Sequence, residues 1–215
     1  MKNFLKTSVA LLLSFAILGC SSAYYGTMEK LGVHKREILV DRVKEARESQ
    51  QEGEQQFSSA LEQFKSIVQV DGGNIEKAYN KLDKEYEKSR DAAEEIRDRI
   101  ESIESVSGAL FKEWRQEIGE YTSANLKRES EDRLKRTERE YEMLIGAMKQ
   151  AESLLQPVLG AMNDQVLFLK HNLNARAISS LEAEVIKIDQ DVDRLLKATR
   201  KAIAEADAFI ANMDA

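Results

Sequence analysis

Cysteine, proline, glycine and aromatic residues are scarce in this chain of 215 residues. A single Cys excludes an intramolecular disulfide and any Cys-rich zinc or iron–sulfur site. One Pro and 10 Gly are too few for a β protein, which needs many turns. The formal charge of −6 argues against nucleic acid as a partner, because surfaces that bind nucleic acid are usually basic.

Charged residues, in contrast, make up 33% of the chain, and hydrophobic residues make up 42%. The chain is rich in Glu, Lys, Arg, Ala and Leu, a composition typical of long helices. Such a composition names no biochemical activity. The sequence therefore informs mainly about the shape of the protein and its place in the cell.

Residues 1–19 have the features of a bacterial secretory signal peptide. Lys2 and Lys6 form a positive start, and the apolar stretch that follows is short for a membrane span. It ends in Ile17-Leu18-Gly19-Cys20, which resembles the bacterial lipobox. The resemblance implies cleavage between Gly19 and Cys20 and attachment of acyl chains to Cys20. The alternative is a structural Cys that happens to follow an apolar stretch.

A lipid on Cys20 would place the protein on a membrane. In lipoproteins of this type, a residue other than Asp after the lipidated Cys favours the outer membrane of a Gram-negative host, and Ser21 fits that pattern. Loss of Lys2 and Lys6 makes the mature chain more negative than −6, so anionic lipid would attract it little. We expect residues 20–30 to form a lipidated N-terminus and a short tether, with the protein facing the periplasm.

Beyond the tether, apolar residues recur at steps of three and four, which is the heptad pattern of packed helices. The pattern is weakest at Gln50 and Gly53, and Gly53 marks either a close approach of two helices or a soft spot. The four predicted helices span roughly 31–70, 74–118, 123–155 and 157–212. Glycines at Asp71-Gly72-Gly73 and polar residues near Gly119 predict the first two turns.

Pro157 predicts the third boundary, although the sequence leaves open whether it makes a turn or only a kink. Because no single helix could bury its apolar stripe alone, the sequence predicts an all-α fold. We expect one domain over 31–215, an elongated antiparallel helical bundle or coiled coil of about four long helices. On the outside of the third helix, three acid–base pairs four residues apart are expected to form salt bridges: Glu129–Arg133, Glu131–Lys135 and Asp132–Arg136.

A search for catalytic or metal-binding patterns yields one weak candidate. His171, Asn172 and Asn174 lie in the most apolar stretch of the mature chain, and a buried His or Asn needs hydrogen-bond partners. They could form a polar site inside the bundle or simply a satisfied core group. Glu94, Glu95 and Asp98 lack the Glu-x-x-His pairing of di-metal bundles. We therefore expect no metal, no cofactor and no enzymatic activity.

Several runs together resemble a bacterial family known as domain of unknown function 2959. They are Ser22-Ala23-Tyr24-Tyr25-Gly26 to His34-Lys35-Arg36, Asp71-Gly72-Gly73, Pro157-Val158-Leu159, and the stretch from Val166 to Ala175. The resemblance covers nearly the whole mature chain. It implies a helical envelope protein, without implying a mechanism.

Three functional hypotheses follow. The leading one is a non-enzymatic, lipid-anchored envelope protein whose bundle serves as a scaffold or interaction module, with another envelope protein or a second copy as partner. The second is a membrane-remodelling or permeabilising protein, motivated by the apolar stretch from Val166 to Leu173. The third is a hydrolase or metal protein with a polar site near His171.

Overall fold

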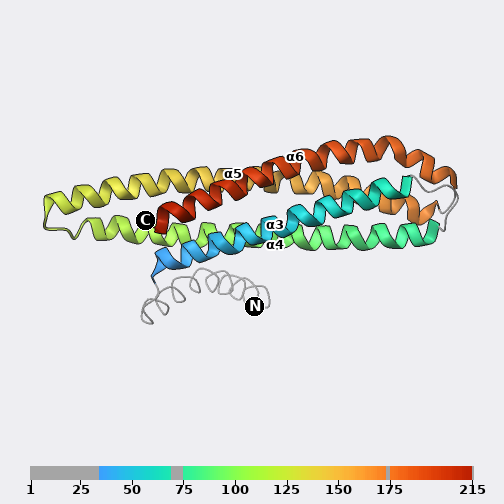
Figure 1. Cartoon of the computed structure of the whole chain (residues 1–215). Coiled ribbons are helices and arrows are strands. Elements are labelled where there is room, and N and C mark those ends of the chain that lie inside the picture. Colours follow the sequence, from blue (N-terminus) through green and yellow to red (C-terminus); the bar gives the residue numbers. More distant parts are fainter. Residues whose placement is uncertain (1–33, 69–74, 173–174, 215) are drawn as a thin grey trace, which may run out of the picture.

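The computed structural model describes residues 34–68, 75–172 and 175–214. Within these ranges the chain forms four helices and no strand (Figure 1): α3 (Lys35–Val68), α4 (Ile75–Ile118), α5 (Ala124–His171) and α6 (Ala175–Asp214). The predicted all-α bundle of four long helices is confirmed. The predicted signal peptide, the tether over 20–30 and the Asp71-Gly72-Gly73 turn lie outside the described residues.

The four helices form an elongated ring in which each packs against two neighbours. α4 and α6 both pack on α3, and both pack on α5. Successive helices run in opposite directions (Figure 1). α3 and α6 are also antiparallel, because Arg47 pairs with Asp207 at 2.9 Å and Lys65 pairs with Asp189 at 2.6 Å. The connectivity is therefore up-down-up-down with short turns.

The core follows the heptad positions that the sequence indicates. The side chains at these positions are almost fully buried: Leu39, Val43, Phe57, Phe64, Leu82, Ile96, Ile100, Ile103, Leu144, Met148, Leu195, Ala202, Ala206 and Phe209. α6 contributes small side chains, such as Ala202 and Ala206. Each fully buried large aliphatic or aromatic side chain contributes roughly 1.5–3 kcal/mol. The fold is therefore held together along its whole length.

Gly53 of α3 packs tightly against Ile96 of α4. A Cβ added at Gly53 would sit 2.6 Å from Cδ1 of Ile96, which is shorter than any normal contact. Of the two interpretations that the sequence leaves open, the structure supports the close approach. Gly108 on α4 is different, because an added Cβ there would meet nothing within 4 Å.

The α4–α5 hairpin projects beyond the start of α3 and the end of α6 (Figure 1). Its turn has the predicted chemistry. Gly119 N donates to Gln116 O at 2.9 Å, and Ser123 caps α5 by accepting a hydrogen bond from Leu126 N. Trp114 Nε1 donates to Ser130 Oγ at 2.9 Å and joins the two helices near the tip.

The predicted helix boundary at Pro157 is wrong. α5 continues through Pro157 to His171, so the third and fourth helices span 124–171 and 175–214 rather than 123–155 and 157–212. Proline inside a helix costs about 3 kcal/mol. Pro157 is exposed, however, so water can bind the carbonyl that loses its partner, and the turns on either side bury Leu155, Val158 and Met162. Burial of three such side chains exceeds the cost of the proline.

The two glycines give a matched test of the packing. Gly53→Ala is expected to lower the melting temperature, because the new methyl group forces Ile96 out of its packed position. Gly108→Ala is expected to raise it, since Ala is favoured over Gly in a helix by about 1 kcal/mol and meets no neighbour. Circular dichroism at 222 nm during heating measures both. An equal gain for the two variants would contradict the close approach.

Candidate functional site

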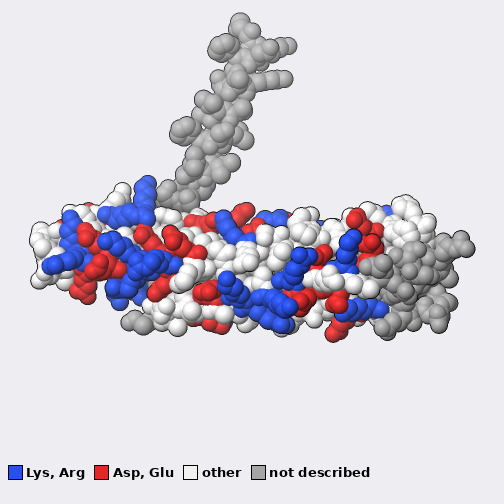
Figure 2. Space-filling model, turned by 90° about the horizontal axis from the view of Figure 1, so that it is seen from above, with Lys and Arg blue, Asp and Glu red and all other residues white. Residues whose placement is uncertain are grey.

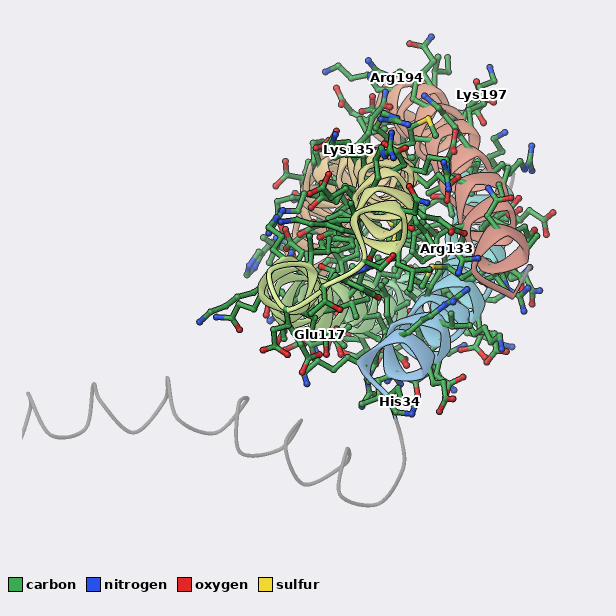
Figure 3. All side chains as sticks on the ribbon, turned by 90° about the vertical axis from the view of Figure 1, so that its left-hand side faces the viewer. His34, Glu117, Arg133, Lys135, Arg194 and Lys197 are labelled. Carbon is green, nitrogen blue, oxygen red and sulfur yellow. The ribbon has the colours of Figure 1, made fainter. Side chains whose placement is uncertain are left out.

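The start of α3 is the point where the predicted tether joins the bundle. Lys35 Nζ pairs with Glu113 Oε1 of α4 at 2.9 Å, although Lys35 is almost fully buried. Arg36 donates to the carbonyl of Met213, where a cation complements the negative end of the α6 dipole. Figure 3 looks along the bundle from this end, with His34 at the base of α3. The first turn of α3 is thus fixed to both neighbouring helices.

Cys20 and Gly19 lie outside the described residues. The segment between Cys20 and the start of α3 can span at most about 50 Å when fully extended. The projecting hairpin lies at the same end of the bundle as the start of α3 (Figure 1). A lipid on Cys20 would therefore hold this end of the molecule within reach of the membrane.

A polar network joins α3 and α4 inside the bundle. Gln56 Nε2 donates to Glu85 Oε2 at 3.1 Å and to Ser89 Oγ at 3.3 Å, and Ser89 donates to the Glu85 carbonyl at 2.9 Å. Lys88 pairs with Glu85 at 2.7 Å. Burial raises the pKa of Glu85, but the hydrogen bonds from Lys88 and Gln56, with nearby cations, hold that pKa below its ordinary value. The carboxylate is thus kept charged within a packed seam.

Gln50, one of the weak heptad positions, has no such network. It is 1% exposed, and neither its amide nitrogen nor its amide oxygen has a hydrogen-bond partner among the described residues. An unsatisfied buried polar group costs about 1–3 kcal/mol. Gln50 and Ser89, two polar residues in the seam, therefore differ, since only Ser89 lies in a satisfied cluster. The role of Glu85 was not predicted, although its position four residues before Ser89 was available as a signal.

The structure does not bring together the predicted polar cluster at the end of α5. His171 is the last residue of α5 and is exposed, and Asn172 is half-buried and caps the helix. The Asn172 side chain donates to the Phe168 carbonyl of its own helix at 2.9 Å. Asn174 lies outside the described residues. In this stretch the apolar residues Val166 and Leu169 are buried instead. His171 faces solvent because α5 continues past Pro157.

The three acidic residues of α4 that were considered as metal ligands lie on its solvent side. Glu94, Glu95 and Asp98 are exposed, and Glu95 pairs with Arg99 at 3.2 Å. Within residues 34–68, 75–172 and 175–214, no group of three His, Cys, Asp or Glu side chains is arranged to hold a metal ion. No described helix has the length and apolar character needed to cross a membrane.

Comparison with known protein families places the chain in one of them. The model of a family described as proteins of unknown function, DUF2959, matches residues 24–213, and the chain belongs to that family. The resemblance predicted from the sequence is thereby confirmed. No curated protein and no solved structure matches the chain.

Gln50 and Gln56 provide a matched pair for the polar seam. Gln50→Leu is expected to stabilise the bundle by about 1–3 kcal/mol, because it removes an amide that has no partner. Gln56→Leu is expected to destabilise it, because Glu85 and Ser89 each lose a hydrogen bond. Urea unfolding of both variants measures the two free energies. A loss of stability in Gln50→Leu would show that this amide has a partner.

Glu85 should make the stability depend on pH. Because its pKa is lowered in the folded chain from the ordinary value of 4.5, its contribution is present above 4.5 and is lost as the pH falls through the folded value. Glu85→Gln is therefore expected to flatten the acid limb of a plot of stability against pH. Urea midpoints between about pH 6 and pH 3 measure the effect. Glu94→Gln, at an exposed position, serves as the control.

Proposed function

We propose that this member of the DUF2959 family is a non-enzymatic lipoprotein of the bacterial cell envelope. Acyl chains on Cys20 anchor it to a membrane, and the helical bundle serves in the periplasm as a scaffold or interaction module. The observation that carries the proposal is the lipobox-like Ile17-Leu18-Gly19-Cys20 at the end of a signal-like stretch. Ser21 after the Cys favours the outer membrane in a Gram-negative host.

The geometry of the bundle supports a role at a membrane surface. The start of α3, which follows the predicted tether in the sequence, lies at the same end as the projecting α4–α5 hairpin (Figure 1). Two or three acyl chains, each contributing about 0.8 kcal/mol per buried methylene, suffice for a stable anchor. α5 alone has 48 residues, so it extends for about 70 Å. Such a body offers long side surfaces to a partner in the periplasm.

The two alternatives gain no specific support. Permeabilisation by the stretch near Val166 would need helices that release a packed core, since Val166 and Leu169 are 4% and 0% exposed. A site around His171 would need converging side chains, whereas the side chain of Asn172 bonds to its own helix. Both remain less favoured than the anchored scaffold.

The anchor is tested by Cys20→Ala in the full chain. The variant is expected to keep residues 1–19 and to lose the membrane attachment that depends on lipid, because no acyl chain can be added. Membrane fractionation and the mass of the purified chain measure both effects. Ser22→Ala, which leaves the lipobox-like residues intact, is expected to behave as the wild-type chain. Unaltered processing and fractionation of Cys20→Ala would contradict the proposal.

A further inference from the structure

One side of α5 faces away from the other three helices, and its charges are sorted along its length. We define the α5 outer face by the exposed residues at helical spacing: Arg128, Asp132, Lys135, Arg136, Arg139, Met143, Gly146, Gln150, Ser153, Pro157, Asp164 and Phe168. The part before Met143 has four cations and one acid. From Met143 onward, Asp164 is the only charged residue of the face. The face therefore has a basic first half and a second half with a single acid.

The charged residues of the α5 outer face form no ion pair within the described part of the chain, and Arg128 donates a hydrogen bond to Asn125 at 2.9 Å. The expected pairs Glu129–Arg133, Glu131–Lys135 and Asp132–Arg136 are not formed, so that prediction is wrong. Exposed pairs of this type gain little over hydration, and long side chains lose entropy in forming them. The flank of α5 that faces α4 does form ion pairs, such as Lys149 with Glu104 at 2.5 Å. Lys135 and Arg133 project from different sides of α5 (Figure 3).

Apolar and small residues are exposed on the α5 outer face. Met143 is 57% exposed and Phe168 is 39% exposed. A Cβ added at Gly146 would meet nothing within 4 Å, and the same holds for Gly160 beside the face. Glycine is unfavourable inside a helix, and no close approach of another described residue requires it here. Charged side chains crowd the hairpin end in Figure 2, and a largely white surface lies near the middle.

A groove between α5 and α6 adds an independent observation. Pro157, Gly160 and Ala161 line it, together with Phe168 of α5 and Leu181 of α6. Gln165 also lines this groove. It is 6% exposed, and its Oε1 atom has no hydrogen-bond partner among the described residues. The groove thus contains a buried acceptor that has no donor among the described residues.

We propose that the α5 outer face binds the same face of a second copy, antiparallel, about a twofold axis at Gln150. A twofold contact pairs residues that are equally distant from the axis. Arg136 and Asp164 lie equally far before and after Gln150 in the sequence, and neither has an ion pair with another described residue. Met143 and Pro157 are likewise equally distant from Gln150.

The antiparallel arrangement matches the chemistry of the face. Arg136 lies on the flank of the face nearer α6, as Gln165 does, and donates to the partner's Asp164 and the partner's Gln165. Met143 fills the groove beside the partner's Pro157. Gly146 lets the two backbones approach closely near the axis, and Gln150 meets its own copy there, as polar residues that fix register do. A parallel pair would instead place the two basic halves against each other.

The area of the face approaches that of a stable dimer. With the axis at Gln150, residues 129–171 of the two copies overlap over about 65 Å, and a face about 10 Å wide offers roughly 650 Å². Stable interfaces bury about 800 Å² per partner, and the rim of the α5–α6 groove adds to the α5 face. The inference rests on the proposed function in that it names the partner of the interaction module, although the contact itself needs no lipid. Two copies anchored in one membrane would lie with their long axes along its surface.

Cysteine crosslinking of the full chain tests the proposal. Gln150→Cys places two thiols at the twofold axis, so a short bismaleimide is expected to convert most of the protein to a crosslinked dimer. Gln55→Cys is the matched control, because Gln55 is equally exposed on α3, diagonally across the bundle. The wild-type chain reports any crosslinking through Cys20. Equal crosslinking of Gln55→Cys and Gln150→Cys would overturn the proposal.

A charge swap tests the register. In the Gln150→Cys chain, Arg136→Asp is expected to lower the yield of crosslinked dimer about tenfold, because two like charges then meet at each end of the contact. Adding Asp164→Arg is expected to restore it. Failure of the second change to restore the dimer would overturn the antiparallel register. Loss of the crosslink on moving the protein from neutral to anionic vesicles would assign the basic half to lipid headgroups instead.

Membrane fractionation of the same samples separates this inference from the proposed function. A crosslinked dimer in a chain that does not fractionate with membranes would leave the contact standing and contradict the lipid anchor. A membrane-bound chain without a Gln150→Cys dimer would leave the anchor standing and overturn the contact. In the Cys20→Ala background, the crosslink through Gln150→Cys is expected to persist.

Discussion

Every feature of this molecule depends on the burial of four long apolar stripes. A single helix cannot remove its stripe from water, and the ring arrangement gives each helix two antiparallel neighbours that can do so. Buried side chains such as Phe57, Ile100 and Leu195 contribute along the whole length of the bundle. Because most apolar residues are directed inward, most charged residues lie outside, and the long sides of the bundle become the surfaces that can bind a partner.

The same constraint explains how polar residues behave within the seams. Gln56, Glu85 and Ser89 satisfy one another, so a polar layer can exist at the α3–α4 seam without a large cost. Gln50 lacks partners and weakens the seam at its own position. Near it, Gly53 allows α3 to approach Ile96 closely, so the two weak heptad positions of the sequence have opposite structural meanings. One is a packing device, and the other is an unsatisfied group in the core.

The helices, their antiparallel order and the cap at Ser123 were predictable, because heptad spacing and capping chemistry are local in the sequence. The helix boundary predicted at Pro157 was wrong because a proline on the outside of a helix removes only one hydrogen bond, and water can bind the freed carbonyl. The exposure of Pro157 cannot be known before the packing of α5 is known. The polar cluster predicted around His171 was wrong because the exposure of His171 depends on where α5 ends. The sorted charges of the α5 outer face were accessible in principle. In the linear sequence Arg136 and Arg139 are close to acids such as Glu138 and Glu140. Only the helical spacing shows that these two acids lie beside the face and not on it.

The central claim is that a helical bundle is held at one end by lipid on Cys20, with a face on α5 free to bind. Mass spectrometry of the N-terminal peptide of the mature protein, purified from membranes, tests the anchor most directly. The account predicts a peptide that begins at Cys20 and has the mass of attached acyl chains, with no peptide from residues 1–19. An unmodified Cys20 within a chain that retains those residues would contradict it.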